Sequence, residues 1–249
     1  MIKNQAISLV MPCKNESKSL KTVLEKLPSE IDEVIVVDNN SSDKTKQVAS
    51  SFAAKTLSEL RYDKNGIGYG FALQKGIRGA KGNIIVCMDG DGSYPIEEVP
   101  KIVKELIKKN LDFISCNRLP VNDPKKMSVV RATGVKILNF VVWVLFGYKI
   151  KDSLTGMWVF KNYVYKQLNP IKGGWDFSLE IKLKAITNKT VRFSEYHIPY
   201  QDRILDLSKQ KLFKTGFNHV LYLFRLRLNM AKKLLPSLIY IRSQNTDGN

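Results

Sequence analysis

The stretch Ile84-Ile85-Val86-Cys87-Met88-Asp89-Gly90-Asp91 decides the fold of this chain. Its five consecutive apolar residues, preceded by Lys81-Gly82-Asn83, are typical of a strand that is buried on both faces of a parallel sheet. Asp89 and Asp91 follow at the carboxyl end, which is where open α/β sheets place their ligands. Two carboxylates separated by one residue suit a divalent cation that also binds a diphosphate, although a solvated Asp-Gly turn has the same pattern.

The segments on either side of this strand alternate between strand and helix patterns. Expected strands are 6–11, which Pro12 ends, 34–37 and 113–116; expected helices are 16–27, 44–54, 65–78 and 94–109. Such alternation implies right-handed crossovers and a mostly parallel sheet flanked by helices. The sequence shows no linker or internal repeat, so we predict an α/β fold with a single Rossmann-like domain and amphipathic helices at its C-terminal end.

Polar residues follow each strand of the first half, and the carboxyl ends of parallel strands meet at one sheet edge. The polar clusters are 12–16, Asp38 and the Asp89–Asp91 pair. Acidic groups gathered there suit the hydroxyls of a nucleoside and a metal-bound diphosphate. Glycines in 66–70 would let backbone approach a nucleotide closely. Their spacing is not that of a dinucleotide-binding fingerprint, and they do not follow the first strand, which argues against a dehydrogenase.

Positive charge is concentrated in the second part of the chain. The net charge is +17, yet residues 1–100 hold 13 basic and 13 acidic residues, so residues 101–249 supply the whole excess. This asymmetry indicates that the second part faces something anionic, either a nucleic acid or a membrane surface. A lysine-rich surface that only contacts solvent would give the same total.

Apolar patterning bears on how the chain meets a membrane. Ile137 to Tyr148 is the longest uncharged stretch, and its twelve residues fall short of the roughly twenty that a spanning helix needs. We therefore expect no spanning helix. Lys136 and Lys149 flank this stretch, which fits a helix lying in the membrane interface and a buried core helix equally well. A basic amphipathic segment over 211–249 has a similar character.

The start of the chain and the cysteines bear on the compartment. Met1 leads directly into the first apolar stretch, so we expect no signal peptide. Cys13, Cys87 and Cys116 lack the spacing of a metal site, and we interpret them as buried thiols in a reducing cytosol.

The order of these motifs resembles an inverting family 2 glycosyltransferase with the GT-A fold. In the first half, the matching segments are Leu9-Val10-Met11-Pro12-x-x-Asn15-Glu16, Val36-Val37-Asp38-x-x-Ser41-x-Asp43, Gly68-x-Gly70-x-Ala72 and Met88-Asp89-Gly90-Asp91. In the second half, segments resemble the polyprenyl-phosphate branch, which includes dolichyl-phosphate mannose synthases: Asp112-Phe113-Ile114-Ser115-x-x-Arg118, Asp152-x-x-Thr155-Gly156, Phe177-x-x-Glu180 and Arg203-x-x-x-x-Ser208-Lys209. The resemblance covers about residues 6–210. It implies a GT-A domain over 1–210, with a donor half of about 1–116 and an acceptor half of about 117–210.

The resemblance also implies roles for individual residues. Donor-binding residues would be Pro12, Asn15, Glu16, Asp38, Asp43, Gly68, Gly70, Asp89, Gly90 and Asp91, with Asp89 and Asp91 holding Mg²⁺ or Mn²⁺. Acceptor-binding residues would be Arg118, Arg131, Asp152, Thr155, Glu180, Arg203, Ser208 and Lys209. Catalytic residues would be Asp89, Asp91, Arg118, Arg203 and Lys209. Two departures from the branch are Asp206, where glycine is usual, and Ser93-Tyr94, which replaces a histidine-containing sequence.

The function implied by the resemblance is transfer of a hexose from a GDP-mannose or UDP-glucose type donor to a polyprenyl (dolichyl) phosphate. The enzyme would be cytoplasmic and peripheral on the cytosolic face of a membrane, with or without a membrane-anchoring subunit, and no nucleic acid is expected. An ionised phosphate acceptor needs orientation and cationic groups rather than a general base.

Two alternatives remain open from the residues alone. A family 2 transferase of polysaccharide or glycolipid synthesis would need a base for a sugar hydroxyl, and Asp176 or Glu180 could serve. The other alternative is a non-catalytic protein that binds a nucleotide sugar or a nucleic acid. We interpret His197 and His219, which sit in no recognisable motif, as structural.

Overall fold

The computed structural model describes residues 1–64, 66–121, 127–201 and 212–244, with side chains of the last helix described over 213–229. Its strands are β1 (Ile7–Cys13), β2 (Glu33–Asp38), β3 (Lys55–Ser58), β4 (Ile84–Cys87), β5 (Phe113–Asn117), β6 (Trp158–Lys161) and β7 (Phe193–His197). Its helices are α1 (Ser17–Glu25), α2 (Thr45–Ser51), α3 (Tyr69–Gly79), the 3-10 turn η1 (Ile96–Glu98), α4 (Val99–Lys108), α5 (Val129–Phe146), α6 (Asn162–Leu168), α7 (Asp176–Thr187) and α8 (Leu212–Gln244).

The strands of the described part form one sheet in the order β3-β2-β1-β4-β6-β5-β7. β1 pairs in parallel with β2 and β4, β2 with β3, and β5 with β7. β6 runs antiparallel to both β4 and β5. The predicted α/β class with a mostly parallel sheet is confirmed. The strand that leads to Asp89 has a parallel neighbour on one side only, because an antiparallel β6 lies on its other side.

One local prediction about the first strands is wrong, and one strand was not predicted. β1 does not end before Pro12; Pro12 lies in register with Val37 of β2, and the chain leaves the strand after Cys13. Pairing of β1 with β4 has already ended at Val10 and Cys87, so the missing N–H of Pro12 interrupts no second ladder. Sequence patterning also missed β3, whose four residues, Lys55 to Ser58, form a partly exposed edge strand with little apolar signal.

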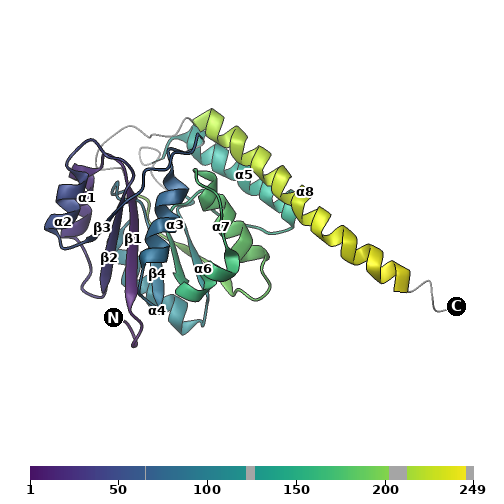
Figure 1. Ribbon diagram of the computed structural model, residues 1–249, viewed down its shortest axis with the longest axis horizontal. Coiled ribbons are helices and arrows are strands. Elements are labelled where there is room, and N and C mark those ends of the chain that lie inside the picture. Colours follow the sequence, from purple (N-terminus) through teal and green to yellow (C-terminus); the bar gives the residue numbers. More distant parts are fainter. Residues whose placement is uncertain (65, 122–126, 202–211, 245–249) are drawn as a thin grey trace.

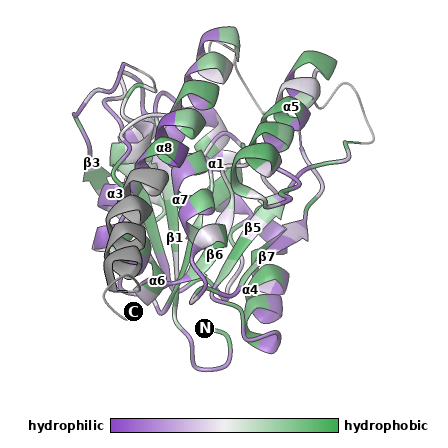
Figure 2. Ribbon diagram, turned by 90° about the vertical axis from the view of Figure 1, so that its right-hand side faces the viewer, coloured by the Kyte–Doolittle hydropathy of each residue, from purple (hydrophilic) through white to green (hydrophobic). Residues whose placement is uncertain are grey.

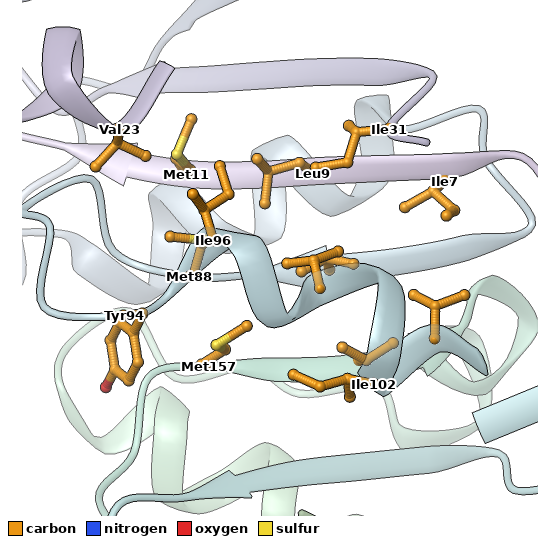
Figure 3. Close-up of a cluster of buried hydrophobic side chains, with 14 of the residues drawn as sticks. Ile7, Leu9, Met11, Val23, Ile31, Met88, Tyr94, Ile96, Ile102 and Met157 are labelled. Carbon is orange, nitrogen blue, oxygen red and sulfur yellow. The ribbon is translucent and has the colours of Figure 1, made fainter. Parts of the chain in front are cut away.

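Helices cover both faces of the sheet (Figure 1). One core cluster joins the sheet to α1, α2 and α4, and Figure 3 shows Val23 of α1, Met11 of β1 and Ile102 of α4 within it. The other cluster joins the opposite face to α3, α6 and α7, through residues such as Leu73 and Phe177. Cys13, Cys87 and Cys116 are buried free thiols, as predicted. With both faces covered, the carboxyl edge of the sheet is where loops can form a site.

Helices α5 and α8 lie side by side at one end of the molecule, and α8 continues beyond the rest of the fold (Figure 1). A third cluster, which includes Leu138, Val142 and Leu223, packs them together and against α7. Hydrophobic residues are frequent along the described parts of both helices (Figure 2). Exposed large apolar side chains on α5 and α8 are Val129, Val130, Ile137, Phe140, Trp143, Val144, Phe213, Phe217, Leu221, Phe224 and Leu228.

The interpretation of α5 as a buried core helix is wrong, since only 17% of its 18-residue window is buried inside the structure. Among the described residues, α5 is the one helix that is long and apolar enough to cross a membrane by length and composition. Arg131 and Lys136 lie within it, which is why the uncharged run alone looked too short.

Candidate active site

A polar pocket lies at the carboxyl ends of β1 and β4, where the sequence placed the donor site. Its lining residues are Pro12, Cys13, Lys14, Glu16, Asn39, Ile67, Tyr69, Asp89, Gly90, Asp91 and Trp175. Parallel pairing of β1 with both β2 and β4 brings these loops to one edge. The structure therefore brings together Pro12, Glu16, Asp89, Gly90 and Asp91 from the predicted donor set.

Both aspartates of the pocket are held by defined donors. Tyr69 donates its hydroxyl to Oδ1 of Asp89 at 2.8 Å. Ser93 donates its backbone N–H at 3.0 Å and its hydroxyl at 2.5 Å to Oδ1 of Asp91, which is buried. The residue between them must be small, because a Cβ on Gly90 would lie 2.5 Å from Sγ of Cys13. The two carboxylates are therefore oriented before any ligand binds.

The donor set of this pocket fits Mg²⁺ or Mn²⁺. Carboxylate oxygens are the ligands that these hard cations prefer. No group of three or more His, Cys, Asp or Glu side chains that could hold a metal occurs in the described ranges. Two carboxylates without a complete protein cage suit a cation whose remaining ligands are water and substrate phosphate oxygens.

Several predicted donor residues shape the loops instead of lining the pocket. Asn15 accepts the backbone N–H of Ser42 at 2.7 Å, and Asp43 accepts those of Ser17 and Thr45 at 3.0 Å each. These bonds join the loop after β1 to the loop after β2. Their contribution is to fix the shape of the pocket wall.

Asp38 is fully buried at the end of β2 and does not line the pocket. Its Oδ2 accepts the Ser41 N–H at 3.3 Å and lies 3.5 Å from the Lys46 ammonium. Its Oδ1 is buried without a hydrogen-bond partner among the described residues. The neighbouring Asn39 does line the pocket, and its side-chain amide donates to the Ile67 carbonyl at 2.8 Å.

Gly68 and Gly70 do not line the pocket either. A Cβ on Gly68 would lie 2.1 Å from the Arg61 carbonyl oxygen, and one on Gly70 would lie 2.4 Å from that of Lys172. Gly68 also has φ +89°, which favours glycine. Both positions face protein backbone, whereas the residue of this turn that reaches the pocket is Ile67.

An apolar groove of about 660 Å³ adjoins the polar pocket and runs between α5 and α8. Its apolar lining includes Val129, Val130, Val135, Ile137, Leu138, Leu154, Phe213, Phe217 and Val220, and its polar lining includes Asp89, Ser93, Tyr94, Arg118, Arg131 and Ser178. His219 also lines it, and burial lowers the pKa of this imidazole to about 4. His219 is therefore neutral at pH 7.

Arg118 faces this groove from a buried ion pair. Its Nε and Nη2 donate to the two carboxylate oxygens of Asp152 at 2.7 and 2.9 Å, and its backbone N–H donates to the same group at 3.1 Å. The Tyr200 ring lies 5.4 Å from the guanidinium carbon. Burial favours the neutral form of Asp152, but the charge and hydrogen bonds of Arg118 outweigh it and lower the pKa. Both groups remain charged at neutral pH.

A second buried cation, Lys182 of α7, lies behind this pair. Its ammonium donates to the carbonyl oxygens of Thr155 at 2.9 Å and Asp152 at 3.4 Å, and its side chain is fully buried. Burial lowers its pKa from 10.5 to about 7, although Asp152 opposes the shift. Lys182 thus supports the backbone of the 152–155 segment, in which both predicted acceptor residues, Asp152 and Thr155, are inaccessible to solvent.

Lys182 should give the stability of the protein a measurable pH dependence. An unfolded lysine keeps its proton up to about pH 10.5, whereas folded Lys182 releases it near pH 7. Between these values the unfolded state binds more protons, so the free energy of unfolding rises with pH, by up to about 1.4 kcal/mol per pH unit. Lys182→Met should lack this part of the slope. Urea titrations of both proteins at pH 7, 8 and 9 measure the difference, and parallel slopes would contradict the assignment.

Asp176 and Glu180 lie at a separate cavity of about 910 Å³ between α7 and α8. One carboxylate oxygen of Glu180 accepts the backbone N–H groups of Ile171 and Lys172 at 2.9 and 2.8 Å, and the other is 3.0 Å from the Lys184 ammonium. Burial raises the pKa of Asp176, which is 3.5 Å from the Lys172 ammonium. Neither carboxylate lines the polar pocket or the apolar groove.

Three predicted acceptor residues, Arg203, Ser208 and Lys209, lie outside the described residues, as does Asp206. Arg131, another basic residue of the predicted acceptor set, lines the groove. Sequence reasoning missed Tyr69, Ser93, Tyr94 and Trp175 as site residues. Ser93-Tyr94 departs from the family pattern, and the structure gives both hydroxyls a role: that of Ser93 donates to Asp91, and that of Tyr94 accepts the Gly156 N–H at 2.6 Å.

The sequence of this chain matches those of known proteins. A family model described as "Glycosyl transferase family 2" matches residues 8–168. An uncharacterized glycosyltransferase of Mycobacterium tuberculosis is 39% identical over 116 residues, which are 47% of this chain and 50% of that protein. The chain thus spans about half the length of this relative. A Pyrococcus furiosus protein named dolichol-phosphate mannosyltransferase is 25% identical over 232 residues, covering 88% of this chain and 63% of the relative.

The fold also has solved counterparts. The crystal structure of glucosyl-3-phosphoglycerate synthase from Mycobacterium tuberculosis, in complex with Mn²⁺, uridine diphosphate and glucosyl-3-phosphoglycerate, aligns with a TM-score of 0.68 at 18% identity. The alignment covers 90% of this chain and 80% of that one. At this identity the likeness establishes the GT-A architecture alone.

Proposed function

Because this chain belongs to glycosyl transferase family 2, we propose that it transfers a hexose from a nucleoside-diphosphate sugar to a polyprenyl phosphate, with inversion. One observation carries the proposal: the polar pocket, which ends in Asp89 and Asp91, meets an apolar groove of about 660 Å³ at Asp89. A charged donor and an apolar acceptor would thus approach the same carboxylate from two sides. The name of the Pyrococcus furiosus relative supports the same acceptor class.

The donor would occupy the polar pocket. Pro12, Glu16 and Asn39 lie on the wall where the nucleoside would bind, whereas Asp38, next to Asn39 in sequence, is fully buried and does not line this wall. Asp89 and Asp91 would hold Mg²⁺ or Mn²⁺ against the diphosphate. The cation would neutralise charge on the departing nucleoside diphosphate. Tyr69 and Ser93 keep the two carboxylates oriented throughout, through the bonds described above.

The acceptor would occupy the groove, with its phosphate toward Asp89 and its isoprenoid chain between α5 and α8. Arg131 lines this groove and would supply positive charge for the phosphate, whereas Arg118, which also lines it, is already paired with Asp152. Among the described residues that line the groove, Asp89 has the one carboxylate and His219 the one imidazole; with a pKa of about 4, His219 is a weak base. A phosphate oxygen is already ionised at neutral pH and attacks without a base, whereas a sugar hydroxyl requires one.

The outer surfaces of α5 and α8 would rest on a membrane. Exposed apolar side chains such as Phe140, Trp143 and Phe217 alternate there with exposed cations, including Lys136 and Arg225. This mixture suits the interface of an anionic bilayer. A peripheral position would bring the open side of the groove next to the lipid that carries the acceptor. We propose the cytosolic face, where nucleotide sugars would reach the pocket from solution.

A transfer assay with an acceptor panel tests this function. Purified protein with Mg²⁺ or Mn²⁺ would receive labelled GDP-mannose, UDP-glucose or UDP-N-acetylglucosamine, together with a short-chain polyprenyl phosphate, the free polyprenol or a soluble oligosaccharide. We expect label in the organic phase only with polyprenyl phosphate and with one preferred donor. Label on the oligosaccharide would favour polysaccharide or glycolipid synthesis, and donor binding without transfer to any acceptor would favour a non-catalytic protein.

A further inference from the structure

Within the described ranges, three residues line both the polar pocket and the apolar groove: Tyr69, Asp89 and Trp175. In the reaction proposed above, the anomeric carbon of the hexose must lie where the two cavities meet. The diphosphate departs on one side of this carbon and the acceptor oxygen attacks on the other. The side chains common to both cavities therefore surround the transferred hexose, whichever sugar it is.

Trp175 and Tyr69 form one aromatic wall at this junction. Their ring centroids are 4.7 Å apart with an interplanar angle of 37°. Tyr69 is buried and is fixed at its far end by its hydrogen bond to Asp89. Trp175 is only half-buried and contributes to both cavity linings. Aromatic faces with a few placed polar groups are the usual lining of sites that bind small molecules.

The position of Trp175 depends on glycines 66 and 70. A Cβ on Gly66 would lie 2.3 Å from the Trp175 backbone nitrogen, and one on Gly70 would lie 2.4 Å from the Lys172 carbonyl oxygen. The space instead holds direct contacts between backbones: the Gly70 N–H donates to the Gly173 carbonyl at 2.8 Å. The absence of side chains at Gly66 and Gly70 therefore allows the start of α3 to pack closely against the 172–175 segment. This packing fixes the position of the Trp175 indole.

We propose that Trp175 is the residue that selects the hexose of the donor. The indole face would cover the C–H surface of the sugar while Asp89 accepts a hydrogen bond from one of its hydroxyls. An epimer that turns a hydroxyl toward the indole would leave that hydroxyl without a partner, and such a mismatch is what specificity pockets reject. This inference rests on the proposed function, since it assigns the sugar of that same reaction to the junction.

Binding measurements with paired ligands test the role of Trp175. Dissociation constants would be measured with Mn²⁺ for UDP, UDP-glucose and UDP-galactose, and for GDP and GDP-mannose, on wild type, Trp175→Leu and Trp175→Phe. The control is Phe52→Leu, which removes a partly exposed ring at the end of α2, away from both cavities. We expect Trp175→Leu to reduce the preference between the two UDP-hexoses by about tenfold or more. Diphosphate affinity should change by less than about threefold, and Trp175→Phe should retain part of the preference.

The outcomes separate two failures. If Trp175→Leu binds the diphosphate normally and keeps the wild-type preference between hexoses, the indole is a packing residue and this inference is overturned. If Trp175→Leu no longer binds the diphosphate, the test passes to Trp175→Phe. A wild-type preference between the two UDP-hexoses in that variant also overturns the inference. If the wild type binds no nucleoside diphosphate with Mn²⁺, the proposed function itself fails.

Discussion

Replacing Asp91 with asparagine should reduce the rate of hexose transfer by at least about 10²–10³-fold, the usual cost of losing one preorganised electrostatic contact with a transition state. Asp91→Asn keeps the shape of the side chain and an oxygen that can accept the bonds from Ser93. It removes the negative charge that would hold the cation against the diphosphate. The fold should therefore persist while Mn²⁺ no longer strengthens the binding of the nucleoside diphosphate, which titration calorimetry with and without metal would measure.

The matched control for this change is Asp32→Asn. Asp32 lies at the opposite, amino-terminal edge of the sheet, where it accepts the Ile7 N–H at 2.8 Å and pairs with the N-terminal amine at 3.0 Å. We expect this variant to keep transfer activity and metal-dependent binding. An Asp91→Asn protein that turns over at the wild-type rate would remove the metal role from Asp91 and with it the proposed handling of the leaving group.

Replacing Arg118 with methionine should destabilise the protein by about 3–5 kcal/mol, because it leaves a buried carboxylate without its counter-ion. Asp152 is fully buried, and Arg118 supplies two side-chain hydrogen bonds as well as the opposing charge. Lys182 does not substitute for them, since its ammonium binds backbone carbonyls instead of the Asp152 carboxylate. Chemical denaturation monitored by circular dichroism measures the change.

Arg192→Met is the control, because Arg192 has the same two-pronged geometry in a different environment. Its Nε and Nη2 donate to Asp112 at 2.8 Å each, but its side chain is 49% exposed and Asp112 keeps bonds from Lys161 and Tyr163. Asp112 is itself buried, but it keeps these two partners when Arg192 is removed, so we expect a smaller loss of stability than for Arg118→Met. Equal losses in the two variants would contradict the view that the buried Asp152 carboxylate depends on Arg118 as its counter-ion.

Much of the donor side could be predicted because its signals are local. The apolar run before Asp89 predicts the strand, the strand predicts the sheet edge, and the edge predicts that Glu16 and Asp89 converge. The predicted end of the first strand at Pro12 was wrong because the effect of a proline on a strand depends on which strand lies opposite. That neighbour is set by the order of strands in the sheet, not by local sequence. Asn15 and Asp43 lie in the predicted loops, yet their side chains accept hydrogen bonds from neighbouring loop residues instead of lining the pocket.

The acceptor side was harder to predict because its contacts are distant in sequence. Arg118 and Asp152 were both singled out, but their pairing across 34 residues has no local signal. The contact of Gln74 with the Lys172 carbonyl spans 98 residues, and it is contacts of this kind that bring Trp175 to the pocket. The glycines in 66–70 suggested a loop that approaches a ligand. In the structure, Gly66 and Gly70 instead make room for the 172–175 segment of the same chain.

The most direct test of the central claim is the linkage in the lipid product. Material labelled from the preferred donor would be extracted, treated with mild acid and examined by NMR at the anomeric position. We predict one hexose joined through its anomeric carbon to the polyprenyl phosphate, with the configuration inverted relative to the donor and all label released by mild acid. Label that resists mild acid, or an anomeric configuration that is retained, would contradict it.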